Sequence, residues 1–333
     1  MARESKAKRD ARRFGRPETM ADMAINWAWR EDPKSRINLD GLIAICAAAK
    51  NIEATNVYRY FMEMHNKEWG WWNLPALRLS FNPTLVEYPY FLPEEAGSRS
   101  QKETQLGVIF IHRRDISEFL DDYRRFGIGD NLATKLHEDI PLIESRCRHI
   151  YDFAMLMAHR GQQWLAHICG GSLFLDEQFA MIRAPVVQVT KNFVGIAREP
   201  EQTKRFLQLA ITPSLLALSF MNCKNVTVQP HDPNPAINRE RHKARLKPFV
   251  RYHTINIEPM KQVLRTEGGV ESNGLKKALH ICRGHFATYT TSLMGRTLDK
   301  PVTVWKPAHV RGSAKHGVVV SDYSVKAPEE PRP

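Results

Sequence analysis

The spacing of apolar residues predicts helices over much of the first two thirds of the chain. Between residues 141 and 160, successive apolar positions lie four, three, four and three residues apart, as in one stripe along a helix. The stripe consists of Ile143, Cys147, Ile150, Ala154 and Met157. Helical patterns also cover Glu18–Arg30, Leu39–Phe61 and Pro200–Ala217, where Pro213 requires a break or a second helix start. This part of the chain is therefore expected to be mainly helical.

Strands are expected at few places in this part. Leu106–Ile111 is a continuous apolar run and the clearest buried strand. A helix is expected directly after it, with Asp115 as its cap, Glu118 completing a capping box and Gly127 ending it.

Short runs rich in β-branched and aromatic residues predict strands in the last third of the chain. These runs are Ser219–Val228, Val250–Ile257, Phe286–Thr290, Val302–Trp305 and Val318–Val320. Leu275–Leu279 is expected to form the last turns of a helix. We therefore predict an α+β protein, in which a helix-rich N-terminal part with a few strands precedes a small antiparallel or mixed β-sheet with a helix before it.

The pattern divides the chain into regions. We expect a flexible basic arm at residues 1–16, a mainly helical α+β region at 17–210, a sheet region at 211–325 and a disordered tail at 326–333. The arm contains seven basic and two acidic residues. It either adds salt-sensitive affinity for a phosphate backbone or is a solvated terminus. A single continuous fold is the alternative to two folded regions.

Composition narrows the class of protein. A hydrophobic content of 43% in 333 residues supports a real core. The net charge of +12 suggests an anionic partner, usually nucleic acid, and its alternative meaning is general solubility. The five cysteines are odd in number and widely spaced, which predicts no disulfide framework and favours a reducing cytoplasm. No apolar run approaches the length of a membrane span, so no membrane partner is expected.

The stretch Gly274–Val325 concentrates the side chains most capable of chemistry. If its strands are regular, Arg283, His285 and Tyr289 share one side of the first strand. Trp305, His309 and Arg311 likewise share a side of the second strand, although Pro307 makes that strand an edge or a bulge. If the two strands are neighbours, two histidines and two arginines converge.

This combination suits phosphodiester chemistry without a metal or another cofactor. His285 and His309 would act as acid and base in unknown order, while Arg283 and Arg311 hold the phosphate. Tyr289 and Trp305 would position the substrate, and a 2′-hydroxyl nucleophile favours RNA over DNA. The alternative is that these are surface residues or satisfied polar groups at a sheet edge.

Further basic and aromatic residues are candidates for binding nucleic acid. Beside the proposed catalytic residues these are Trp305, His280 and Lys306. A basic run in an expected loop adds Arg239, Arg241, Lys243 and Arg245, and the run continues to Lys247.

A zinc site is a competing interpretation of the same stretch. Cys282 and His285, with His280 and His309 nearby, offer sulfur and nitrogen ligands. The usual paired ligand spacing is absent, and strand geometry sends Cys282 and His285 to different faces. We therefore expect no metal. Phosphate-loop, dinucleotide-binding, metalloprotease and nucleophile-elbow motifs are also absent.

The C-terminal motifs also carry a resemblance. The pattern His280-x-x-Arg283-Gly-His-Phe, the block from Trp305 to Gly312 and the final strand to Tyr323 resemble the C-terminal part of a group of bacteriophage and mobile-element proteins of unknown activity. The resemblance also covers Ser219–Val226. It implies a phage or mobile-element setting and no mechanism. A weaker, architectural likeness is to small ribonuclease toxins, whose sheet presents His, Arg and Tyr.

Two hypotheses follow. The first is a nucleic-acid-directed protein that cleaves RNA without a metal. The second is a binding or interaction protein in which the same residues serve affinity or stability.

Overall fold

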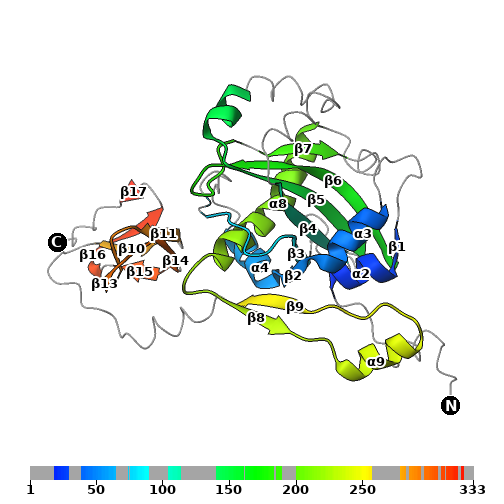
Figure 1. The fold of residues 1–333 in the computed structure, drawn as a ribbon. Coiled ribbons are helices and arrows are strands. Elements are labelled where there is room, and N and C mark those ends of the chain that lie inside the picture. The colour runs from blue at the N-terminus through cyan, green and yellow to red at the C-terminus, as the bar shows by residue number, and fades with distance from the viewer. Residues whose placement is uncertain are drawn as a thin grey trace, which may run out of the picture. The chain divides into compact units, whose positions relative to one another are not determined.

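The computed structural model describes several ranges of the 333-residue chain. They are residues 19–29, 39–64, 74, 76–89, 104–113, 140–160, 162–183, 185–189, 200–256, 278–282, 285–293, 296–306, 309–311, 313–321 and 324–325. The expected basic arm, the helix expected after Asp115 and the expected tail lie outside these ranges. The chain forms two compact units (Figure 1). Unit 1 comprises Met1–Asn222 and Val228–Ile255, and unit 2 comprises Cys223–Thr227 and Asn256–Pro333.

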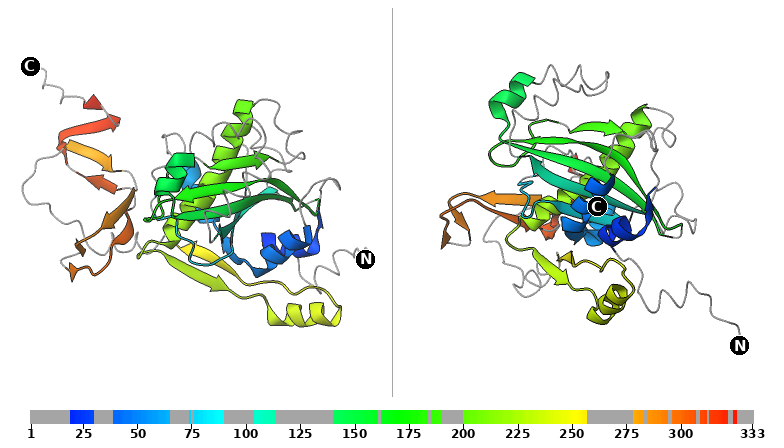
Figure 2. Two further views of the ribbon diagram at one scale, coloured as in Figure 1. Left: turned by 45° about the horizontal axis from the view of Figure 1, so that its top comes forward. Right: turned by 45° about the vertical axis from the view of Figure 1, so that its right-hand side comes forward.

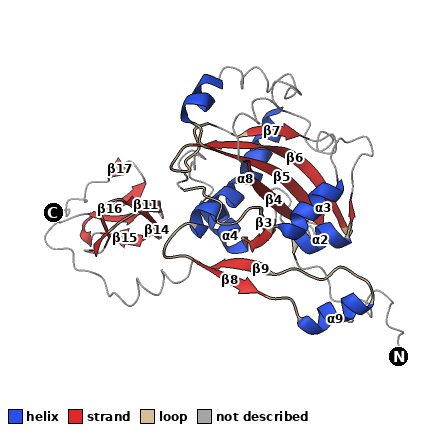
Figure 3. Cartoon of the chain, viewed as in Figure 1, coloured by secondary structure: helices blue, strands red, loops and turns tan. Residues whose placement is uncertain are grey.

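A mixed nine-stranded sheet is the frame of unit 1 (Figure 3). Eight strands follow the order β1-β6-β5-β4-β3-β2-β9-β8, and β7 pairs with β6. Their bounds are β1 (Ala28–Trp29), β2 (Lys50–Glu53), β3 (Thr84–Pro89), β4 (Thr104–Arg113), β5 (His149–His159), β6 (Trp164–Leu175), β7 (Val186–Val189), β8 (Thr227–His231) and β9 (Tyr252–Asn256). From β3 to β6 the strands are antiparallel, whereas β2 is parallel to both β3 and β9.

Helices cover both faces of this sheet (Figure 2). They are α2 (Met20–Asn26), α3 (Leu39–Ala48), α4 (Thr55–Met64) and α8 (Pro200–Met221), while α9 (Pro235–Lys243) lies between β8 and β9 in sequence. Leu85 of β3 packs with α2 and α3, whereas Tyr88 of the same strand stacks on Tyr58 of α4 with ring centroids 5.3 Å apart. Residues of opposite parity on a strand point to opposite faces, so α2 and α3 lie on one face and α4 on the other.

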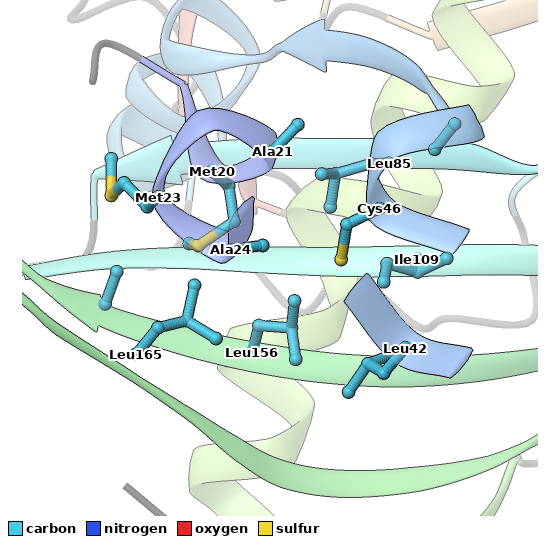
Figure 4. Close-up of a cluster of buried hydrophobic side chains, with 12 residues drawn as sticks. Met20, Ala21, Met23, Ala24, Leu42, Cys46, Leu85, Ile109, Leu156 and Leu165 are labelled. Atoms are coloured by element: carbon cyan, nitrogen blue, oxygen red, sulfur yellow. The ribbon is translucent and has the colours of Figure 1, made fainter. Parts of the chain in front are cut away.

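One core cluster lies between the sheet and the helices α2 and α3 (Figure 4). Met20, Met23 and Cys46 come from the helices, and Ile109 and Leu156 come from the sheet. All of these side chains are buried, and their removal from water is the main force that holds the layers together.

The expected fold, a helix-rich first part followed by a small sheet, is wrong. Residues 140–146 are helical, but most of the expected helix over residues 141–160 is the central strand β5. Both faces of β5 are covered, so apolar residues occupy both parities of the strand. Alternation is lost in such a strand, and apolar residues then also fall at helical spacing by coincidence.

Other elements match the sequence prediction more closely. The strand expected at Leu106–Ile111 is the centre of β4, and the strand expected at Val250–Ile257 is β9. The pattern over Leu39–Phe61 contains two helices, α3 and α4, with the buried strand β2 between them. Helix α8 includes Pro213 and runs to Met221, where the sequence pattern indicates the start of a strand.

Unit 2 is built from short strands. They are β10 (Ala278–Cys282), β11 (His285–Tyr289), β12 (Ser292–Leu293), β13 (Arg296–Thr297), β14 (Val302–Lys306), β15 (His309–Arg311), β16 (Ser313–Ser321) and β17 (Ser324–Val325). Four strands form one sheet in the order β15-β10-β16-β17, and β11–β14 and β12–β13 are separate pairs. The helix expected at Leu275–Leu279 therefore overlaps strand β10.

Across the described ranges, no helix has both the length and the apolar character that a membrane span requires.

Candidate functional site

The strands that carry the predicted catalytic residues are paired in unit 2. Strand β11 is antiparallel to β14, with His285 opposite Lys306. Strand β10 is antiparallel to β15, with His280 opposite Arg311 and Cys282 opposite His309. Opposite residues are offset in the same way in both pairs, since His280 is opposite Arg311 in one and His285 is opposite Lys306 in the other.

The register groups these positions differently from the prediction. Opposite residues of an antiparallel pair share a face, as do residues two apart on one strand. His280, His309 and Arg311 therefore occupy one face of the β10–β15 pair. His285 belongs to the other pair, where it shares a face with Lys306 and Tyr289. Arg283 lies outside the described residues.

Trp305 has a structural role in unit 2. Its side chain is only 1% exposed and meets Phe286 edge to face, with ring centroids 4.7 Å apart. The side-chain amide of Asn225 accepts a hydrogen bond from the Trp305 N–H (2.9 Å) and donates one to its carbonyl (3.0 Å). A ring packed in this way does not offer a face to a base, so the stacking role predicted for Trp305 does not fit its burial.

Tyr289 and Lys306 lie together on the β11–β14 pair. The Lys306 ammonium is 5.1 Å from the centroid of the Tyr289 ring, within the range of a cation–π contact. Both side chains are half-buried. This contact holds the Lys306 charge on the face that His285 occupies.

The basic run predicted as a loop forms helix α9 and the turn after it. Asn234 caps the helix by accepting a hydrogen bond from the Ala236 N–H at 2.9 Å, and Pro235 stands at the first helical position, where no N–H is needed. The exposed basic side chains of this segment are Arg239, Lys243, Arg245 and Lys247. The sequence prediction of exposed cations here fits all four positions.

Arg241 is the exception in the basic run, since it is only 4% exposed. Its Nε donates to the Lys247 carbonyl at 2.8 Å, and its Nη2 donates to Asn26 Oδ1 at 2.7 Å. Its guanidinium also lies 3.9 Å from the centroid of the Phe249 ring. Arg241 therefore fixes the basic segment to α2, and its predicted contact with nucleic acid does not fit its burial.

Further basic groups, which the sequence did not single out, continue from this segment into the sheet. Burial lowers the pKa of Lys50 on β2, and the charge of Arg251 lowers it further. Burial likewise lowers the pKa of His253 on β9, and the charge of Lys50 adds to that effect. These groups lie close together because β2 and β9 are parallel neighbours. We call the following side chains the basic strip: Arg239, Lys243, Arg245, Lys247, Arg251, His253 and Lys50.

Aromatic rings lie along the same part of the sheet. The Lys50 ammonium is 3.2 Å from the centroid of the Phe81 ring, and Phe81 is 42% exposed. Tyr252 stacks on His231 with ring centroids 4.9 Å apart. Phe81 is thus an exposed ring beside a cation, which is the usual composition of a surface that binds single-stranded nucleic acid. Tyr252 is half-buried and has opposite parity to Arg251 and His253, so it points to the other face of the sheet.

Metal ligands and thiols are the remaining candidate groups among the described residues. The described residues contain no group of three or more His, Cys, Asp or Glu side chains placed to hold a metal ion. Burial raises the pKa of Cys46, Cys169 and Cys223 to about 12, so these thiols are not nucleophiles at neutral pH.

Comparison with known proteins gives no relative, since no protein-family model, curated protein or solved structure matches the chain.

Proposed function

We propose that the protein binds nucleic acid through the basic strip, and RNA in preference to DNA. The observation that carries the proposal is the excess of exposed cations on α9, in the turn after it and directly before β9. The segment Thr227–Asn256 contains six Lys and Arg residues, five of which are exposed, but only two Asp and Glu residues. Such an excess attracts a phosphate backbone and releases its counterions.

The two acidic residues of the segment leave most of this charge uncompensated. Asp232 pairs with Arg251 at 2.6 Å, and Glu240 pairs with Lys243 at 2.8 Å. Exposed pairs of this kind are weak, and a phosphate can replace either carboxylate. Arg239, Arg245 and Lys247 form no ion pair within the described part of the chain. Three cations are therefore available at once.

The test is binding of labelled single-stranded RNA and DNA of one sequence, followed by fluorescence anisotropy over a range of salt concentrations. The variant Arg239→Ala/Lys247→Ala is expected to weaken binding. It should also reduce the slope of log affinity against log salt by about 0.7 for each phosphate of a single strand that the protein no longer neutralises.

The matched control is Arg146→Ala/Lys300→Ala, which removes the same charge from exposed positions outside the strip. We expect this variant to keep the wild-type salt slope. Equal losses in both variants would mean that binding follows net charge alone, and the strip would then not be the site.

Metal-independent RNA cleavage in unit 2 is a second proposal, favoured by the cross-strand register that groups His280, His309 and Arg311. One imidazole would take the proton of a 2′-hydroxyl, whose oxygen attacks phosphorus. The bond from phosphorus to the 5′-oxygen then breaks, and a second imidazole protonates that oxygen. Arginine stabilises the charge on the phosphoryl oxygens. The sequence assigns the two imidazoles to His285 and His309, and the register offers His280 as another partner for His309.

Incubation of RNA and DNA with the protein in EDTA tests cleavage separately from binding. Cleavage of RNA alone is expected, with His309→Ala losing turnover but retaining affinity. His285→Ala and His280→Ala identify which histidine is its partner. Intact RNA in the presence of wild-type protein that binds it would reject cleavage and leave a binding protein.

A further inference from the structure

A pair of histidines in unit 1 stands apart from both sites described above. His112 at the end of β4 and His149 at the start of β5 have ring centroids 5.5 Å apart. His112 is opposite Tyr151 in the register, and Tyr151 is two residues from His149, so all three share a face. His112 meets the Tyr151 ring edge to face at 5.3 Å. Both histidines are half-buried.

The segment 76–79, which carries Arg78, is held by hydrogen bonds to Asn222 and Tyr151. The side-chain amide of Asn222 donates to the carbonyls of Ala76 (2.9 Å) and Arg78 (2.7 Å). The Leu79 N–H donates to the Tyr151 hydroxyl at 3.2 Å. The Arg78 side chain itself is exposed and forms no ion pair among the described residues. These hydrogen bonds fix the backbone that carries the Arg78 side chain.

Phe179 packs against His149 and has a strained backbone conformation. Its φ is +61°, in the left-handed region that a phenylalanine rarely adopts. Its ring stacks on His149 with centroids 4.1 Å apart, and the Arg78 guanidinium lies 5.8 Å from its centroid. The Phe179 carbonyl accepts a hydrogen bond from the Leu77 N–H at 3.0 Å, which joins the backbone of Phe179 to the segment that carries Arg78. Strain of this kind persists only where the surroundings enforce it, and it is frequent at ligand sites.

The charges that face His149 are mostly positive. Burial lowers the pKa of His149, and the charges of His112 and Arg78 lower it further. Asp176 is the opposing group, and its carboxylate already accepts hydrogen bonds from the N–H groups of Gln178 and Ala180, both at 2.9 Å. Tyr151 is buried and neutral, since burial raises its pKa to about 12. An anion at this place would favour the protonated form of His149, which burial and the neighbouring positive charges oppose.

We propose that Arg78, His112 and His149 form a binding site for a phosphate monoester. The guanidinium matches two phosphate oxygens, and the imidazoles donate to the same group when protonated. A monoester carries nearly two charges at neutral pH, so the Arg78 guanidinium attracts it more strongly than it attracts the single charge of a phosphodiester. The site is independent of the basic strip, and its ligand is either a free nucleotide or the phosphorylated end of a nucleic acid.

The pH dependence of binding follows from the chemistry of both partners. Burial and the neighbouring positive charges lower the pKa of His149, so Arg78 supplies the positive charge at neutral pH. A bound phosphate opposes this shift, so binding should raise the pKa of His149. Below about pH 6 the phosphate itself gains a proton, so the affinity falls.

The experiment is titration of the full-length protein with AMP, with adenosine as the ligand that lacks phosphate. The imidazole NMR signals of His112 and His149 should shift with AMP in a saturable manner and not with adenosine. Arg78→Ala should lower the AMP affinity at least about tenfold, as expected for one lost charged hydrogen bond. Lys300→Ala, which removes an exposed charge from unit 2, is the matched control and should keep the affinity.

Equal affinities of wild type and Arg78→Ala for AMP would overturn the proposal, as would equal binding of AMP and adenosine. Arg78 is exposed, so its replacement should leave the melting temperature unchanged and the comparison valid.

A comparison of RNA that carries a 5′-phosphate with RNA that carries a 5′-hydroxyl distinguishes the two sources of the ligand. Tighter binding of the phosphorylated RNA, lost in Arg78→Ala, assigns the site to nucleic-acid ends, and AMP binding alone assigns it to nucleotides. Loss of RNA binding at the basic strip would lower the affinity for both RNAs equally.

Discussion

Glu87 is a carboxyl group that unit 1 buries almost completely, with 2% of the residue exposed. It accepts a hydrogen bond from the N–H of Met20, the first residue of α2, where the helix dipole favours a negative group. Burial nevertheless raises its pKa to about 8, and the charges of Glu53 and Asp22 act in the same direction. Glu87 is therefore mostly protonated at neutral pH in the folded protein.

This raised pKa makes stability depend on pH. Between the ordinary pKa of 4.5 and about 8, the folded state binds a proton that the unfolded state has lost, so the free energy of unfolding falls as pH rises. For a single group, the free energy of unfolding changes by at most about 1.4 kcal/mol for each step of one in pH. Glu87→Gln keeps an acceptor for the Met20 N–H and removes the titration. Urea unfolding should therefore give this variant a shallower loss of stability between pH 5 and pH 8.

Glu144→Gln is the control for that comparison, because Glu144 is exposed. It should retain the wild-type slope. A wild-type slope in Glu87→Gln as well would show that Glu87 is ionised in the folded protein.

At the scale of elements, the pairing of β6 with β7 depends on one residue without a side chain. A Cβ at Gly171 would lie 1.9 Å from the Val186 carbonyl oxygen and 2.8 Å from Cζ of Phe153. Gly171→Ala should therefore separate β7 from the sheet and destabilise unit 1 by about 3 kcal/mol, at the upper end of overpacking costs. The neighbouring variant Gly170→Ala, whose nearest contact would be 3.3 Å, should cost clearly less. Thermal unfolding of the two variants is the measurement, and similar melting temperatures would contradict the close approach.

The elements also show what the sequence could predict. An apolar run identified β4, and a run rich in β-branched and aromatic residues identified β9, because local composition alone determines those patterns. The residues of β5 predict a helix instead, because both faces of the strand are buried and its pattern carries no period of two. The error also hid the pair His112–His149, since a histidine on an expected helix cannot be placed beside the end of a strand.

The basic strip was predictable in part. The run from Arg239 to Lys247 is a local signal that indicated four of its cationic positions, and the alternation of β9 indicated one shared face for Arg251 and His253. Lys50 joins the strip only through the parallel pairing of β2 with β9, which connects residues about two hundred positions apart in sequence. No local pattern records such a pairing. Burial of Arg241 was equally invisible, because it depends on Asn26 in α2.

At the scale of the molecule, the chain enters unit 2 twice. Residues 223–227 belong to unit 2, the chain then returns to unit 1 for β8, α9 and β9, and it re-enters unit 2 at residue 256. Asn222 is bound to the segment 76–78 in unit 1, and Asn225, three residues later, is bound to Trp305 in unit 2. The sequence stretch Ser219–Val226, which lies in an expected strand and carries part of the resemblance, thus contains an anchor for each unit.

The double entry determines how the molecule can be divided. The N–H of Lys224 donates to the Thr303 carbonyl at 3.0 Å, and Asn225 satisfies both backbone groups of Trp305, so residues 223–227 line the edge of β14 like a short strand. A polypeptide that starts at residue 256 would lack this edge and would leave the backbone of a buried tryptophan without its partners. Unit 2 is therefore not a module that a single cut can release. It is a two-piece assembly, which a peptide spanning residues 222–227 could complete in trans.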